Sequence, residues 1–128
     1  MRIIFVPILS MLLLIASCKT SKDSDFNVKE GEIISIISPK NTNSSEDVKI
    51  DVVFTGLNGC SQGYNIKAEK VGQTIVLRAY YSFPNDGRAC TEILPTHKLT
   101  YTFFADLPGT YFFQSAQNNL IADTLVVY

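Results

Sequence analysis

Apolar and polar side chains alternate with a period of two over several short stretches of this chain, and this pattern limits its fold more than any other feature. The clearest stretches are residues 50–54, 64–69 and 75–81. Alternation of this kind is typical of a β-strand with one buried face, because successive side chains point to opposite sides of a sheet. No window of the sequence keeps the 3.6-residue period of an amphipathic helix. The chain is therefore expected to fold as an all-β protein.

Turn signals separate these short segments. Val71-Gly72-Gln73 is expected to close a hairpin between strands 64–69 and 75–81, and a second turn is expected at 117–119. Further strands are expected at 34–36, 99–103, 111–113 and 124–128, and a polar turn at 41–47. About seven strands with a turn every 8 to 12 residues favour a sandwich of two antiparallel sheets over residues 31–128. A small barrel or a jelly roll is the alternative.

The charge balance excludes one class of function. The chain has 128 residues, of which 11 are Lys or Arg and 12 are Asp or Glu, so its formal net charge is −1. Binding to nucleic acid depends on a basic surface that neutralises phosphates. We therefore expect no nucleic-acid partner, and a chain of this length has room for a single ordinary domain.

The N-terminal segment has the layout of an export signal. Arg2 supplies a positive charge, and residues 3–15 are almost wholly apolar, with Pro7 interrupting the run. A transmembrane helix needs about 20 apolar residues, so this run is too short to span a bilayer. We expect residues 1–17 to be a signal peptide that is cleaved from the mature protein.

The end of the apolar run, Ile15-Ala16-Ser17-Cys18, resembles a bacterial lipobox, in which a branched aliphatic residue and two small residues precede a cysteine. The resemblance implies cleavage before Cys18, attachment of a diacylglyceryl group to its thiol and, usually, acylation of the new amine. Two or more acyl chains anchor a protein stably, so Cys18 would hold the mature chain on a membrane. The alternatives are a plain secretory signal with a coincidental cysteine, or a buried N-terminal strand.

Two further expectations depend on this anchor. Residues 18–30 are polar and aperiodic, which predicts a flexible tether between the lipid and the folded domain. Lys19, rather than Asp, follows Cys18, and this differs from the inner-membrane retention signal of some double-membrane bacteria. The expected location is therefore the bacterial cell envelope, with the outer membrane or the cell surface favoured.

Cys60 and Cys90 are expected to form a disulfide. Exported proteins fold in an oxidising compartment, and lipidation of Cys18 leaves these two cysteines as an even pair. The strand order gives a second reason, because the hairpin of residues 64–81 leads away from Cys60 and returns before Cys90. Both cysteines then lie in loops at the same end of the domain. Two separate reduced thiols are the alternative.

The bridge would join two long loops, 56–63 and 84–96, into one rigid surface. Binding residues often lie on loops that a rigid scaffold positions. The candidate binding residues are the polar side chains of these loops: Asn58, Gln62, Asn85, Asp86, Arg88 and Glu92. We expect a protein or a glycan as their partner.

A local pattern near residue 110 is typical of one kind of sandwich. Leu107-Pro108-Gly109-Thr110-Tyr111, followed by Phe113, resembles the turn into the penultimate strand of immunoglobulin-like and fibronectin-like domains. The resemblance implies that the ring of Tyr111 packs inward and that its hydroxyl bonds back to the corner. The domain is therefore expected to be an immunoglobulin-like antiparallel β-sandwich, although the chain lacks the core Trp of antibody domains.

One string of residues also occurs in hydrolases. Gly59-Cys60-Ser61-Gln62-Gly63 fits the G-x-S-x-G pattern of a nucleophilic serine, and Asp86 and His97 follow in the order used by α/β-hydrolases. That pattern requires a helix after the serine, whereas residues 64–69 alternate like a strand. A tight loop beside the bridge explains the two glycines and Ser61 better, so we assign no catalytic residue.

We expect no metal and no cofactor. Asp86, Glu92 and His97 could meet in space as metal ligands, but a single His without a second His or a Cys nearby is more often solvated or bonded to the protein. The sequence contains no phosphate-binding loop, dinucleotide fingerprint, calcium-binding loop or zinc-binding H-E-x-x-H motif.

Three pairs of neighbouring aromatic residues offer a second candidate surface. Alternation is expected to bury Tyr81, Phe103 and Phe113 and to leave their neighbours Tyr80, Phe104 and Phe112 outside. If the outer rings lie together, they form an apolar patch suited to protein or glycan contact. A second sheet or a loop that covers them is the alternative.

The sequence as a whole predicts a lipid-anchored envelope protein that acts as a non-enzymatic binding or structural module. The alternative is a small envelope inhibitor whose bridged loops enter a partner's cleft.

Overall fold

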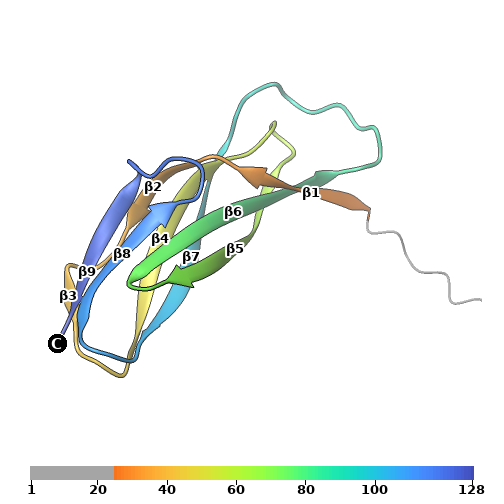
Figure 1. Cartoon of the computed structure of the whole chain (residues 1–128). Coiled ribbons are helices and arrows are strands. Elements are labelled where there is room, and N and C mark those ends of the chain that lie inside the picture. The colour runs from red at the N-terminus through yellow and green to blue at the C-terminus, as the bar shows by residue number, and fades with distance from the viewer. Residues whose placement is uncertain (1–24) are drawn as a thin grey trace, which may run out of the picture.

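The computed structural model describes residues 25–128, which form nine strands in two sheets and contain no helix (Figure 1). The strands are β1 (Phe26–Gly31), β2 (Ile33–Ile37), β3 (Asn41–Thr42), β4 (Glu46–Thr55), β5 (Gln62–Val71), β6 (Thr74–Pro84), β7 (Thr96–Ala105), β8 (Gly109–Ser115) and β9 (Ala122–Val127). The expected signal peptide, lipidated Cys18 and first part of the tether lie outside the described residues.

The two sheets form a sandwich, as the sequence predicts. One sheet has the order β2-β4-β7, and the other has the order β1-β6-β8-β9-β3, with β5 pairing along the opposite side of β6. β8 pairs with the first half of β6 and β1 pairs with its second half. The ribbon of β5, β6 and β1 therefore extends past the other strands at one end of the molecule (Figure 1).

One apolar core fills the space between the sheets. Every second residue from Val48 to Phe54 is buried in β4, and every second residue from Ile75 to Tyr81 is buried in β6. Full burial of a large aliphatic or aromatic side chain stabilises a fold by about 1.5–3 kcal/mol. The alternation read from the sequence at residues 50–54 and 75–81 is confirmed.

The six-stranded sheet is mixed, so the expectation of purely antiparallel sheets is wrong. β6 pairs with β8 in parallel, and β3 pairs with β9 in parallel. The path of the chain explains the first pair. Along the chain, β7 comes between β6 and β8, and it belongs to the other, three-stranded sheet. The chain therefore reverses direction twice, and β8 runs in the same direction as β6.

β1 corrects the expected boundary between tether and domain. Residues 26–30 were expected to be part of the tether, but Phe26–Gly31 forms a strand paired with Ala79–Pro84. β8 reaches only as far as Leu77 along this side of β6, and the backbone groups beyond it need partners that β1 supplies. The folded domain therefore begins at Phe26 rather than at residue 31.

Two further differences come from backbone irregularities. The strand expected at 34–36 buries Ile36, as its alternation implies, but a bulge between Ile33 and Ser35 shifts the register, so Ile33 is buried and Ile34 is exposed. Within the expected polar turn, Asn41–Thr42 forms β3 beside β9. β1 and β3 raise the strand number from about seven to nine in the described residues.

The corner before β8 is built as its local sequence predicts. Tyr111 is buried, its ring centroid lies 5.1 Å from that of Phe103, and its hydroxyl donates to the carbonyl oxygen of Leu107 at 2.8 Å. Gly109 allows this turn, because its φ of +146° is a conformation that L side chains rarely adopt. The inward ring and the hydrogen bond of Tyr111 are confirmed.

Candidate functional site

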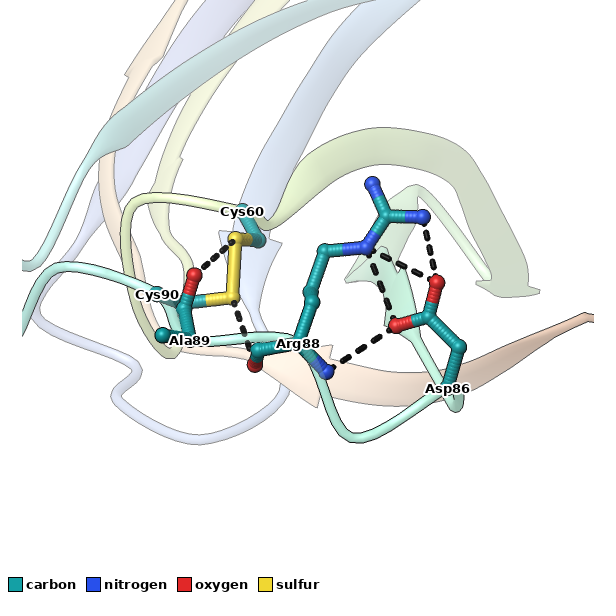
Figure 2. A network of polar contacts seen from close by, with 5 residues as sticks. All are labelled: Cys60, Asp86, Arg88, Ala89 and Cys90. Atoms are coloured by element: carbon teal, nitrogen blue, oxygen red, sulfur yellow. Dashed lines mark hydrogen bonds and ion pairs between the residues drawn. A yellow bond between two sulfur atoms is a disulfide. The ribbon is translucent and has the colours of Figure 1, made fainter.

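The loops after β4 and β6 lie side by side, as the sequence predicts. The amide of Gly56 donates to the carbonyl of Pro95, and that of Gly59 donates to the carbonyl of Thr91, both at 2.9 Å. A disulfide joins Cys60 to Cys90 with their Cα atoms 5.5 Å apart (Figure 2). The expected bridge is confirmed, and it makes the two loops one rigid unit.

Asn58, one of the candidate binding residues, shapes its own loop. Its side-chain oxygen accepts a hydrogen bond from the amide of Cys60 at 3.0 Å. Its carbonyl oxygen accepts from the amide of Ser61 at 3.0 Å and from the hydroxyl of Ser61 at 2.6 Å. Such bonds are typical of turns, where Asn replaces backbone partners. The structure thus gives Asn58 a role in holding Cys60 in place for the bridge.

Asp86 and Arg88 form a fixed ion pair two residues before the bridge (Figure 2). The Nε of Arg88 donates to both carboxylate oxygens of Asp86 at 2.9 Å, and its Nη2 donates to Oδ2. The backbone amide of Arg88 donates to Oδ1 at 3.2 Å. These hydrogen bonds from Arg88 lower the pKa of Asp86 to about 2. The guanidinium therefore has a defined position although it is exposed to solvent.

A cavity of about 200 Å³ lies beside this pair, between the start of β1, the start of β5 and the end of β6. It is lined by Asp25, Phe26, Cys60, Gln62, Ser82, Phe83, Pro84 and Arg88. Gln62 and Ser82 are paired across the two strands, and they face outward because the neighbouring Tyr81 is buried. The cavity thus joins polar groups, aromatic rings and the bridge at one place.

The cavity contains only part of the predicted binding set. Gln62 and Arg88 line it, whereas Asn58, Asn85, Asp86 and Glu92 do not. The backbone N–H of Asn85 instead donates to the backbone carbonyl oxygen of Asp25 at 3.1 Å. This bond holds the start of the domain against the loop after β6.

Sequence reasoning missed the contribution of β1 to the cavity. Asp25 and Phe26 were placed in the tether, yet both line the cavity wall. The signal was present, because Phe26 and Val28 alternate with Asn27 and Lys29 as strand residues do. The strand has only six residues and most of them are exposed, so its sequence is as polar as that of a linker.

Ser61 and His97 lie close together, but Asp86 does not join them. The hydroxyl oxygen of Ser61 is 3.4 Å from Nε2 of His97, and Ser61 itself is buried. Because the single hydroxyl proton of Ser61 is donated to the carbonyl of Asn58, a hydrogen bond in this pair requires His97 to be the donor. Strand β5 begins directly after Ser61, as predicted, in the place where a hydrolase needs a helix.

The outer aromatic rings do not form one surface. Tyr81, Phe103 and Phe113 are buried, as predicted from the alternation. Their neighbours are divided between the sheets, because Phe104 belongs to β7 while Tyr80 and Phe112 belong to β6 and β8. The ammonium group of Lys67 lies 5.0 Å from the centre of the Tyr80 ring and covers it. A patch that combines all three rings is therefore excluded.

No group of three or more His, Cys, Asp or Glu side chains in residues 25–128 is arranged to hold a metal ion. No helix in the same range is long and apolar enough to cross a membrane.

Comparison with known proteins gives no relative for this chain. No protein-family model, no curated protein and no solved structure matches it.

Proposed function

We propose that this protein is a lipoprotein of the bacterial cell envelope, held on a membrane by acyl chains on Cys18, and that its sandwich is a non-enzymatic binding or structural module. The sequence Ile15-Ala16-Ser17-Cys18 after an apolar run is the observation that carries the anchor. The Cys60–Cys90 bridge supports export, because such bonds persist in oxidising compartments. Within the envelope, Lys19 favours the outer membrane or the cell surface.

The cavity beside the bridge supports a binding role. Arg88 is held by Asp86 at its edge, and Phe26 and Phe83 contribute apolar surface to its wall. A cavity that combines polar groups with aromatic rings suits a ligand with hydrogen-bonding groups on an apolar body, and protein and glycan partners both have such groups. The hydroxyl of Ser61 is committed to the Asn58 carbonyl, which supports a module without catalytic function.

Incorporation of an alkyne-labelled fatty acid in cells tests the anchor. The wild-type protein is expected to carry the label, and Cys18→Ser is expected to lose it completely. The matched control is a Cys60→Ser/Cys90→Ser double variant, which keeps Cys18 and should remain labelled. Label retained in Cys18→Ser would refute acylation at this residue.

An inhibitor remains the second candidate, because the bridge gives the loops after β4 and β6 the rigidity that entry into a partner's cleft requires. A photo-crosslinking residue in the anchored protein on cells tests the surface that both candidates use. Adducts from position 88 but not from position 112 would support recognition through the loops. Adducts only from position 112, on the outer face of β8, would reject both the cavity and the loops as the binding surface.

We also propose that the sandwich is a divergent member of the immunoglobulin-like architecture. The Tyr111 corner supports this assignment, because its hydroxyl bonds to Leu107 in the way that the tyrosine of that corner does. The parallel pairing of β6 with β8 is a departure from the antiparallel sheets of that architecture. Nuclear Overhauser contacts between Thr74–Leu77 of β6 and Phe112–Ser115 of β8 test this pairing, and their absence would remove the departure.

A further inference from the structure

Three large aliphatic side chains are exposed on the bridged loops. The exposed fractions are 43% for Leu57, 70% for Ile93 and 64% for Leu94. The Gly56–Pro95 and Gly59–Thr91 backbone bonds hold segments 57–58 and 92–94 next to each other. We call Leu57, Ile93 and Leu94 the aliphatic tip. Its position is fixed, because the two backbone bonds and the disulfide immobilise both loops before any partner is present.

The chain enters the folded domain at the same end. The backbone carbonyl oxygen of Asp25 accepts a hydrogen bond from the backbone N–H of Asn85. Asp25 also lines the same cavity as Cys60, and Cys60 follows Leu57 by three positions. The C-terminus lies at the opposite end of the sandwich (Figure 1). Asp25 follows Cys18 by seven positions, a length of chain that spans at most about 25 Å. An acylated Cys18 would therefore keep this end of the domain near the lipid surface.

We infer that the aliphatic tip docks on the membrane that holds Cys18, with Leu57, Ile93 and Leu94 entering the boundary between head groups and acyl chains. This inference rests on the proposed acylation of Cys18. The anchor makes docking intramolecular, so a small apolar contact is sufficient. Asp86 is paired with Arg88 and Asp51 with Lys98, and the residue directly before Ile93 is the acidic Glu92, so docking depends on apolar burial rather than on attraction to anionic lipids.

Docking at the tip leaves the cavity available. Gln62 and Ser82 open it toward the outer side of the six-stranded sheet, whereas the tip lies at the ends of β4 and β7 in the three-stranded sheet. The lipid surface and the proposed ligand would therefore contact different sides of the bridged loops. Docking would also fix the orientation of the sandwich, with the turn between β7 and β8 on the side away from the membrane.

A single tryptophan tests this orientation, because the chain has none. The full-length gene is expressed with Ile93→Trp, and the protein is extracted from membranes and reconstituted into phosphatidylcholine vesicles. The matched control is Leu107→Trp, at a residue 63% exposed on the β7–β8 turn. Flotation of the vesicles reports anchoring. Emission wavelength and quenching by lipids brominated on the acyl chains report insertion of the ring.

The inference predicts that both variants float, that Trp emission of Ile93→Trp shifts to shorter wavelength and is quenched, and that emission of Leu107→Trp does neither. Equal quenching of both variants, or quenching of neither, in floating protein would overturn docking at the tip and leave the anchor intact. Protein that does not float would overturn the proposed anchor and the inference with it. If the Trp emission of Ile93→Trp is blue-shifted in detergent as well, and the shift grows with protein concentration, the tip contacts a second copy of the chain. That result would also overturn membrane docking.

Discussion

The sequence predicted the structural role of Tyr111 in more detail than that of any other core residue. Its hydroxyl donates to the carbonyl of Leu107 at 2.8 Å from inside the core. We predict that Tyr111→Phe lowers the free energy of unfolding by about 1 kcal/mol, because it removes one hydrogen bond and keeps the packing of the ring. Urea denaturation measures the change. The control is Tyr128→Phe, at a residue 68% exposed, and equal effects of the two substitutions would contradict the assigned role.

Asp86 and Arg88 lead to a pH-dependent prediction. Hydrogen bonds from Arg88 lower the pKa of Asp86 from 3.8 to about 2. We expect Arg88→Gln to return this pKa toward 3.8, which NMR titration of the side-chain carboxyl measures. A carboxyl whose pKa is lowered by folding stabilises the folded state above its unfolded pKa. The stability difference between the two proteins should therefore be present above pH 3.8 and disappear as the pH falls toward 2. An unchanged pKa would show that the pair does not persist in solution.

Residue-scale reasoning predicted the pairing of the two cysteines and missed the role of a loop asparagine. The bridge between Cys60 and Cys90 followed from cysteine number and strand order, and the structure contains it. Asn58 was assigned to ligand binding because it is polar and lies in a loop, yet its side chain bonds to the amide of Cys60. A sequence does not reveal whether a loop amide bonds to its own backbone, because that depends on the path of the turn.

At the scale of elements, β1 carries the clearest prediction. Its residues pair with Ala79–Pro84 along β6, so their amides should exchange with solvent more slowly than those of an unstructured segment. Hydrogen exchange followed by mass spectrometry measures peptides that cover residues 26–31. The same peptide in the denatured protein provides the reference rate of exchange. Exchange of residues 26–31 as fast as in the denatured protein would show that this segment belongs to the tether.

Strands with clear alternation were predictable, and strands that depend on long-range pairing were not. β4 and β6 bury one face each, so their period of two is visible in the sequence. β1 and β3 are mostly exposed and form because β6 and β9 leave backbone groups unpaired beside them. The bulge in β2 also escaped prediction, because a single extra residue changes the register without a clear sequence signal.

At the scale of the whole molecule, the bridge should be a major source of stability. Cys60 and Cys90 are separated by 30 positions. Closing a loop of this length stabilises a fold by about 3.5 kcal/mol in the chain-entropy description. We predict that Cys60→Ala/Cys90→Ala, introduced into the Cys18→Ser background, lowers the free energy of unfolding by this amount. Urea denaturation against the Cys18→Ser parent measures it, and a loss below about 1 kcal/mol would contradict the assignment.

The general architecture could be predicted because a sandwich needs little more than alternating segments and turns. The pairing of β6 with β8 in parallel could not, since it depends on which sheet β7 joins. The position of the cavity depends on that same arrangement, because β8 stops short along β6 and leaves room for β1, which completes the cavity wall. A site built from three distant segments has no local pattern in the sequence.

The intact mass of the membrane-extracted protein, recorded without reductant and compared with Cys18→Ser, tests the central claim most directly. The account predicts a wild-type chain that begins at Cys18, carries two or three acyl chains and has two hydrogens fewer than the dithiol form. Cys18→Ser should lack the acyl chains. An unacylated wild-type chain, or one that begins at another residue, would contradict the lipoprotein assignment. A mass that includes two free thiols would contradict the bridge between the two loops.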